Sequence, residues 1–236
     1  MVEESARKGL TVNKKKTETM VISKTSPSPS IGIFVNGEEL KQVKQFNYLG
    51  SLITEDGRSE KEIKKRIAAA KRAFGNMKTI LTNGNISLKL RKRFIQTYIW
   101  STMLYGCEAW TINQYSANII EAAEMWIYRG ILRISWRDRV TNVEVLNRMS
   151  TERAILNTIK QRQLRFFGHT VREGDLEADC VMGKMDGKRP RGRPRIKFTN
   201  SLASSTRKST TEMIQKARIR TTWRSVVANV SRDTAP

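Results

Sequence analysis

Carboxylates are the first side chains to consider for catalysis, because two-metal polymerases and nucleases need carboxylates that converge from separate segments. The chain offers Glu55 and Asp56 directly before Gly57, a pattern typical of a turn. It also offers Glu121 and Glu124, on a predicted helix whose polar side we expect to be solvated. We therefore predict no catalytic residue, no metal site and no cofactor in this chain.

The positions of the histidine and the two cysteines in the sequence do not indicate a reactive site. His169 is the single histidine, and no Ser, Cys or Asp is placed to partner it, so we expect a structural role. Cys107 lies between Tyr105 and Trp110, which favours a small buried thiol. Together with Cys180 it forms neither a disulfide framework nor a zinc-ligand spacing, and we expect an intracellular, reducing environment.

The strongest signal in the sequence is its positive charge. The 236 residues include 44 Lys and Arg against 22 Asp and Glu, a formal charge of +22. Such a field attracts polyanions. No apolar run reaches the ~18 residues of a membrane span. We expect nucleic acid as the partner, as an RNA–DNA or DNA duplex, with no membrane association and a nuclear location; the oligomeric state is left open.

Much of this charge lies on one predicted helix. Lys64, Lys71 and Lys78 recur every seven residues, so they share a face opposite an apolar stripe that begins at Ile63. That face can follow a phosphate backbone, although a solvated helix surface is the alternative. The predicted contacts are Lys61, Lys64, Lys65, Lys71, Arg72 and Lys78, extended at the start of the next helix by Lys89, Arg91, Lys92 and Arg93.

A short motif near the C-terminus also combines positive charge with an extended backbone. It consists of Lys188, Arg189, Pro190, Arg191, Gly192, Arg193, Pro194 and Arg195. Gly and Pro keep such a chain narrow, and the flanking Arg side chains can lie in an A·T-rich minor groove. The motif is similar to an AT-hook. A flexible cationic linker or a nuclear-import signal is the alternative.

The elements that would position these residues change in type near residue 58. Residues 17–54 alternate like strands, with turn signals at 26–29 and at Asn36-Gly37, and they predict one small meander in which 43–53 form a single strand. From Ser59 the apolar period becomes helical. We predict an α+β fold, with a small antiparallel N-terminal sheet, a mainly helical body and a basic flexible segment.

Capping residues and apolar stripes divide the helical body. One helix runs from Ser59 to about residue 82, and another starts at Ser87 with a stripe of Leu90, Phe94, Ile95, Tyr98 and Ile99. The other predicted regions are a helix at 116–135, two helices within 141–169 joined by a tight turn at Ser150-Thr151, and a short helical region at 209–230. Thr141 and Ser209 are the predicted N-caps of the last two regions, each with a Glu three residues later.

Seven short segments resemble the reverse transcriptases of LINE-type (non-LTR) retrotransposons. They are Gly9–Glu18, Met20–Ser23, Phe46–Ile53, Leu104–Trp110, Leu132–Trp136, Phe167–His169 and Gly192–Arg195. The resemblance implies that residues 1–57 are the end of the polymerase palm and 58–172 the helical thumb and connection. Residues 173–208 would then be an acidic, then basic, linker, and 209–236 a helical tail.

In such enzymes one strand supports the primer near its 3′ end. The resemblance assigns this primer grip to Phe46, Tyr48, Leu49 and Gly50, and it assigns the duplex contacts of the thumb to the basic helix face. The Mg²⁺-binding carboxylates of the family would lie before residue 1, so we expect this chain to be inactive by itself. The alternatives are a non-enzymatic DNA-binding protein, with 141–169 as a helix-turn-helix and 188–195 as a hook, or a remnant without activity.

Overall fold

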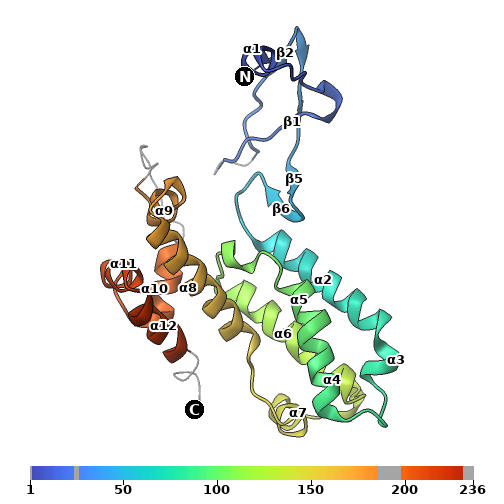
Figure 1. Ribbon diagram of the computed structural model, residues 1–236. Helices are drawn as coiled ribbons and strands as arrows, with labels where there is room; N and C mark the ends of the chain where they lie inside the picture. Colours follow the sequence, from blue (N-terminus) through green and yellow to red (C-terminus); the bar gives the residue numbers. More distant parts are fainter. Residues whose placement is uncertain (1, 24–26, 185–197, 231–236) are drawn as a thin grey trace. The chain divides into compact units, whose positions relative to one another are not determined.

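The computed structural model describes residues 2–23, 27–184 and 198–230, which form an N-terminal unit, Met1–Glu62, and a helical unit, Ile63–Pro236 (Figure 1). Each unit is described by itself below. Short strand pairs near the N-terminus and many helices after them confirm the predicted α+β class.

In the described part of the N-terminal unit, six short strands form three pairs. The unit begins with α1 (Val2–Arg7) and the 3-10 turn η1 (Lys14–Lys16). β1 (Glu18–Thr19) pairs parallel with β4 (Lys41–Gln42), whereas β2 (Phe34–Val35) with β3 (Glu38–Glu39) and β5 (Gln45–Tyr48) with β6 (Ser51–Thr54) are antiparallel. The prediction of one meander was therefore wrong.

Backbone conformation explains why residues 43–53 are a hairpin and not one strand. Leu49 and Gly50 both have positive φ, 46° and 85°, and so reverse the chain between β5 and β6. Only the glycine signalled this turn, because a branched leucine is uncommon at positive φ. Asn36 and Gly37, with φ of 52° and 80°, form the predicted turn between β2 and β3.

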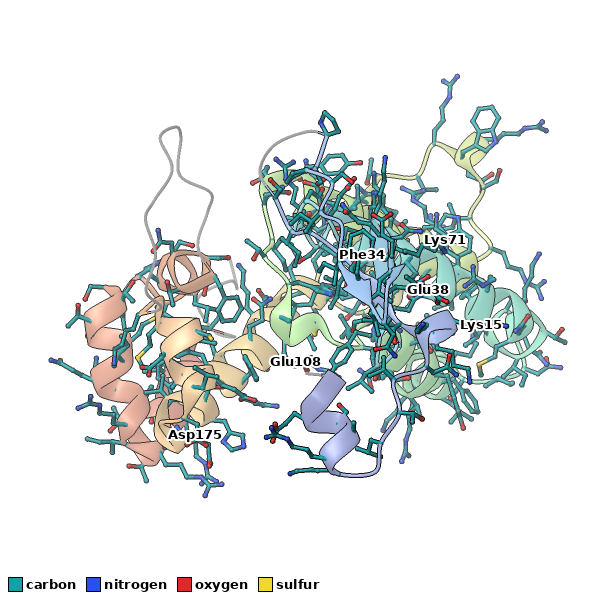
Figure 2. All side chains as sticks on the ribbon, turned by 90° about the horizontal axis from the view of Figure 1, so that it is seen from above. Lys15, Phe34, Glu38, Lys71, Glu108 and Asp175 are labelled. Carbon is teal, nitrogen blue, oxygen red and sulfur yellow. The ribbon has the colours of Figure 1, made fainter. Side chains whose placement is uncertain are left out.

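The N-terminal unit has little core of its own. Its buried apolar side chains, among those described, are Val35 and Leu40. Figure 2 shows the side chain of Phe34 on β2, which is 63% exposed. The other large exposed apolar side chains of the unit are Leu10, Ile22, Ile31, Ile33, Phe46, Tyr48 and Leu49. So much exposed apolar surface is unusual for a self-contained folding unit.

The first core of the helical unit lies among the start of α8 (Ile155–Glu173), which is described below, and six further segments. They are α2 (Glu60–Asn76), α3 (Lys78–Leu81), the run α4 (Leu88–Phe94), η2 (Ile95–Trp100) and α5 (Ser101–Met103), then η3 (Cys107–Ala109), α6 (Gln114–Ile131) and α7 (Asn142–Met149). The core includes Ile63, Phe74 and Leu81 of the predicted stripe. The predicted single helix is broken at Met77, whose φ and ψ of −102° and 7° separate α2 from α3.

The run from Leu88 to Met103 contains a π-helical segment, η2, which changes the face it buries. Ser87 accepts a hydrogen bond from the Leu90 backbone, so the predicted N-cap is confirmed. Ile95 and Ile99 are buried as expected, but Leu90 and Tyr98 are 45% and 50% exposed. The predicted stripe assumed regular α-helical winding, whereas a π segment has a wider turn that shifts the following side chains.

Helix α6 contributes Ile120, Met125, Ile127 and Ile131, among others, to the first core. Gly130 on α6 faces Phe74 of α2, and a Cβ on Gly130 would lie 2.7 Å from the Phe74 ring. The missing side chain therefore permits the close approach of the two helices. α7 and α8 (Ile155–Glu173) both pack against α6.

The loop between α7 and α8 differs from the predicted tight turn. Thr141 caps α7 as predicted, by accepting from the Glu144 backbone. Ser150 does not begin a helix; with φ of 46° it ends α7, and α8 begins five residues later at Ile155.

Helix α8 also contributes to a second core. Its C-terminal half packs with α9 (Leu176–Met182), α10 (Phe198–Thr206), α11 (Thr210–Arg218) and α12 (Arg220–Asn229). The buried side chains include Leu164, Phe167, Met213 and Trp223. Ser209 caps α11 as predicted, by accepting from the Glu212 backbone. In the described ranges no helix has the length and apolar character needed to cross a membrane.

Candidate nucleic-acid interface

The lysines predicted on α2 lie beside exposed aromatic side chains of α6. The Lys64 ammonium is 5.2 Å from the centre of the Tyr115 ring, and the Lys71 ammonium is 5.0 Å from that of Trp126. Both lysines are exposed, and Figure 2 labels Lys71. Tyr115 and Trp126 are 50% and 42% exposed. The surface therefore combines positive charges with π faces, the two groups used to hold nucleotides.

The other lysines and arginines predicted on this helix also lie near the surface. Lys61, Arg72 and Lys78 are exposed, and Lys65 is half-buried. Lys78 belongs to α3, after the break at Met77, and it lines a groove beside α6. Sequence reasoning did not include Arg66, whose guanidinium lies 4.5 Å from the centre of the Tyr105 ring.

The groove next to Lys78 is the aromatic part of this surface. It has a volume of about 790 Å³ and is lined by Phe74, Gly75, Lys78, Trp126, Arg129, Gly130, Ile134, Trp136 and Val140. Trp126 stands edge-on to Phe74, with ring centres 5.3 Å apart, and this contact fixes one wall. We call this groove, together with Lys64 and Lys71 of α2, the α2–α6 face.

Trp136 is held in an exposed position by a short capped turn. η4 (Trp136–Asp138) begins after Ser135, whose backbone N–H donates to the Asp138 carboxylate at 2.6 Å, while its side chain accepts from Arg137. Trp136 itself is 84% exposed. Indole rings usually lose most of their contact with water on folding, so a structured turn that presents one to solvent indicates a contact surface.

The basic cluster at the start of α4 is only partly available for ligands. Lys89 and Arg93 are exposed and, with Lys92, line a shallow hollow of about 570 Å³. The Lys92 ammonium donates to the Ser150 carbonyl at 2.9 Å. Arg91 points inward, where its guanidinium donates to the carbonyls of Ile86 and Ile131 at 3.0 and 3.2 Å. Arg91 therefore links segments of the fold through these hydrogen bonds, which its position in the sequence did not indicate.

The residues assigned to the primer grip form the end of one hairpin. Phe46 and Tyr48 lie on β5 and are 41% and 58% exposed. Leu49 and Gly50 form the turn itself, so the expectation of a continuous strand through Tyr48-Leu49-Gly50 was wrong. An exposed hairpin tip is still a surface at which a backbone can be approached closely.

Glu124 is not on a solvated face, contrary to the prediction. It is 1% exposed, and its Oε1 accepts hydrogen bonds from the Tyr128 hydroxyl and from the backbone N–H groups of Ala154 and Ile155, at 3.1, 3.0 and 3.2 Å. The carboxylate therefore joins α6 to the N-terminus of α8, where the helix dipole favours negative charge. Burial raises the pKa of Glu124, and the hydrogen bonds offset only part of that effect.

Asp56 and Cys107, two other side chains considered for catalysis, have contacts that serve the fold. Asp56 accepts from the Thr54 hydroxyl and the Arg58 backbone, so it belongs to the predicted turn. Partial burial would raise the Asp56 pKa, but these hydrogen bonds hold it below its usual value. Cys107 is fully buried, as predicted, and burial raises its pKa to about 12. In the portion that the structure describes, no three His, Cys, Asp or Glu side chains come together as metal ligands.

The segment around Cys107 is held by α8. The Gln163 amide donates to the carbonyls of Cys107 and Trp110, at 2.9 and 2.7 Å, and Arg162 donates to the Leu104 carbonyl at 3.2 Å. Gln163 is itself buried, so these bonds are protected from water. The Leu104–Trp110 motif therefore has a packing role in this chain.

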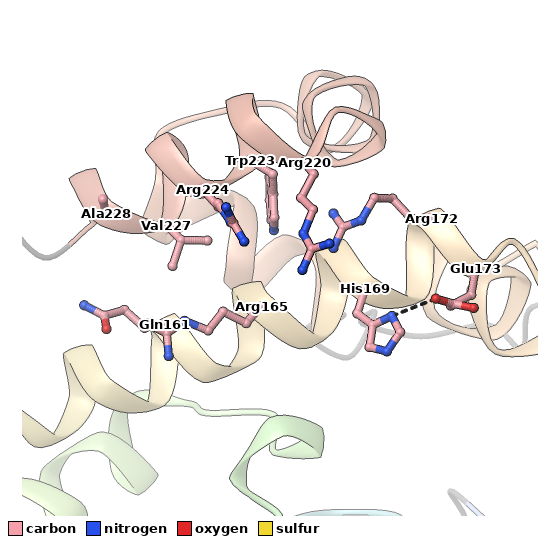
Figure 3. Close-up of a pocket in the computed structure, with 10 residues that line it drawn as sticks. All are labelled: Gln161, Arg165, His169, Arg172, Glu173, Arg220, Trp223, Arg224, Val227 and Ala228. Atoms are coloured by element: carbon pink, nitrogen blue, oxygen red, sulfur yellow. Dashed lines mark ion pairs between the residues drawn. The ribbon is translucent and has the colours of Figure 1, made fainter.

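Sequence reasoning missed a basic groove between α8 and α12 (Figure 3). It has a volume of about 680 Å³, and its lining includes Arg165, His169, Arg172, Arg220 and Arg224. The His169 Nδ1 lies 3.1 Å from a Glu173 carboxylate oxygen, and both side chains are exposed. His169 is thus at the surface. The arginines come from segments about fifty residues apart, which is why no local pattern revealed the groove.

The hook-like motif cannot be placed on this surface. Lys188, Arg189, Arg191, Gly192, Arg193, Pro194 and Arg195 lie outside the described residues. The predicted hook remains a prediction from the sequence.

The chain is similar to an uncharacterized transposon-derived protein of Caenorhabditis elegans. The two are 28% identical over 233 residues, which cover 96% of this chain and 82% of that protein. No family model matches the chain, and no solved structure matches it. The similarity extends over both units, and it relates the chain to a protein derived from a transposable element.

Proposed function

We propose that this chain is the nucleic-acid-binding C-terminal part of a reverse transcriptase from a LINE-type retrotransposon. The α2–α6 face carries the proposal, because it places the ammonium groups of Lys64 and Lys71 against exposed aromatic rings. The similarity to a transposon-derived protein and the short motifs that resemble this family support the same origin.

In the proposed role, the α2–α6 face holds a template–primer duplex. Lysines along α2 and α3 contact successive phosphates, which gives binding that follows backbone shape and not sequence. Trp136 and Trp126 offer stacking surfaces for an unpaired base at the edge of the duplex. The hairpin tip at Tyr48-Leu49-Gly50 supports the primer strand.

The exposed apolar side chains of the N-terminal unit are consistent with this role. Strands at the margin of a larger sheet present apolar side chains and unpaired backbone groups to the next strands. We therefore propose that this unit completes the palm of the polymerase. Catalysis would then depend on palm carboxylates and Mg²⁺ outside this chain, and the chain itself contributes duplex binding.

The first experiment is primer extension on an RNA template by the purified chain with Mg²⁺, beside binding of the same RNA–DNA duplex measured by fluorescence anisotropy at several salt concentrations. We expect binding with a steep salt dependence and no extension. Extension would show that a metal site lies within the chain. Absence of binding would reject the proposed function.

Substitution of Lys64 and Lys71 by Glu tests the α2–α6 face. We expect affinity for every duplex to fall by a similar factor, roughly ten- to hundredfold, with a salt slope shallower by about 0.9 for each lost phosphate contact. Lys15→Glu with Lys44→Glu is a control of equal charge, because both of these lysines are exposed and lie in the N-terminal unit. Equal losses in the two pairs would mean that net charge, and not this face, determines binding.

A further inference from the structure

We propose that the groove between α8 and α12 is a second phosphate-binding site, which holds the backbone of a nucleic-acid strand. This inference rests on the proposed function, since it assumes that the chain binds nucleic acid, and it adds a site far from the predicted thumb face in sequence. The groove lies between one face of α8 and one face of α12, the two helices that also pack against each other in the second core.

Four arginines from two helices converge on this groove. Arg165 and Arg172 are two turns apart on α8, and Arg220 and Arg224 are one turn apart on α12. In Figure 3, Arg220 and Arg224 reach from α12 toward α8. The guanidinium group is planar and always charged, and it matches phosphate oxygens in a bidentate manner, so an arginine cluster is suited to phosphodiesters.

In the part of the chain that the structure describes, Arg165, Arg220 and Arg224 have no carboxylate partner. Among the described residues, Glu173 is the one carboxylate that lines the groove, and it pairs with His169. Across residues 2–23, 27–184 and 198–230, no carboxylate lies within ion-pair distance of Arg165, Arg220 or Arg224. Like charges held together without a counter-ion repel each other, and an anionic ligand would relieve that repulsion.

The groove is held rigid by its floor, which prepares it for a ligand. The Trp223 indole N–H donates to the Leu164 carbonyl at 2.8 Å, and its ring lies 5.6 Å from that of Phe167. Arg172 is fixed in turn, because it donates to the Ala217 carbonyl at 2.8 Å. The packed helices thus fix the backbone positions of the arginines, and only the exposed side chains of Arg165, Arg220 and Arg224 have to be ordered on binding.

A nucleic-acid strand fits this groove better than an acidic peptide. Guanidinium groups at repeated helical spacing from two sides suit a ligand with a regular series of anions, and the phosphodiester backbone is such a series. An acidic peptide carries its carboxylates on flexible side chains without such a fixed repeat, so it matches the paired helical spacing of the arginines less well.

The test compares the unsubstituted chain with the double variant Arg165→Gln, Arg224→Gln, which removes one arginine from each side of the groove. Arg172 is left unchanged because of its bond to Ala217. The control is Arg207→Gln, Arg218→Gln, which removes two exposed arginines outside the groove lining. Binding of a fluorescent single-stranded RNA and of an RNA–DNA duplex is measured against salt, and thermal melts verify that each variant is folded.

We expect the groove variant to lose roughly tenfold in affinity for at least one of the two ligands. Its salt slope should be shallower by about 0.7–0.9 per lost contact, while the control stays near wild type. The inference is overturned if the groove and control variants behave alike while the wild-type chain binds. It is also overturned if polyglutamate displaces the RNA from the groove as well as an equal concentration of unlabelled RNA does. If the wild-type chain binds neither ligand, the proposed function itself is rejected. This outcome differs from binding by the wild-type chain that the groove substitutions leave unchanged.

Discussion

Trp223 lies directly over Gly168, so that a Cβ on Gly168 would fall 2.1 Å from the indole nitrogen. That nitrogen donates to the Leu164 carbonyl one helical turn earlier. The absent side chain on α8 is therefore the space that α12 occupies. This contact gives a physical reason for the glycine in the Phe167–His169 motif.

Replacement of Gly168 by Ala should destabilise the helical unit. The methyl group must displace the indole or the helix backbone, and we expect a loss of about 2 kcal/mol or more, from overpacking and a weakened hydrogen bond. Gly75→Ala is the matched control, because a Cβ there would meet nothing within 4 Å. It should be neutral or stabilising by up to about 1 kcal/mol. Chemical denaturation of both variants measures the difference; equal stability would contradict the packing described for Trp223.

Glu124 should make stability depend on pH. Burial holds its pKa in the folded chain above the ordinary value of 4.5, so the stability contributed by its neutral form is present below that value and is lost as pH rises through the folded pKa. The unfolding free energy of wild type minus that of Glu124→Gln should therefore decrease as pH rises from about 4.5, by at most ~1.4 kcal/mol per unit.

Denaturant titrations between pH 4.5 and 8 measure this difference, in which the other carboxylates cancel. Glu121→Gln is the control, since it removes the same charge from a side chain that pairs with Arg153 on the outside of α6. A difference that is constant with pH would show that Glu124 ionises as it does in the unfolded chain.

Trp136 should contribute to binding and hardly at all to stability. Because the indole is 84% exposed, Trp136→Ala should change the unfolding free energy by less than about 0.5 kcal/mol. If a base stacks on the ring, affinity for single-stranded or frayed nucleic acid should fall by about 1–3 kcal/mol. Trp136→Phe should retain most of the affinity. Fluorescence anisotropy titrations of the three proteins with a single-stranded RNA measure these affinities. Unchanged binding by the alanine variant would remove Trp136 from the proposed interface.

Local signals in the sequence were accurate where the partners are close along the chain. Ser87, Thr141 and Ser209 were correctly identified as N-caps, because a cap depends on a backbone group two or three residues away. The turn at Asn36-Gly37 follows the same logic. The strand pairs were less predictable, because segments of two residues carry almost no alternation and their pairing depends on distant neighbours.

Features that depend on distant neighbours could not be read from the sequence. A helical wheel places Glu124 on the buried stripe of α6 beside Ile120 and Ile127, so the prediction of a solvated carboxylate rested on its residue type and not on its position. The backbone groups of Ala154 and Ile155 that make its burial possible lie thirty residues away and leave no local signal. The lysine face of α2 was evident, but its aromatic neighbours on α6 were not. Arg165 and Arg224 come together only because α12 packs on α8.

Helix α8 belongs to both cores of the helical unit. Ile155 and Ile159 are part of the first core, and Leu164 and Phe167 are part of the second, on one unbroken helix. Neither core can open fully without fraying the helix that the other core needs. The two cores should therefore melt together as a single cooperative unit, so that damage to either one exposes the whole helical unit to proteolysis.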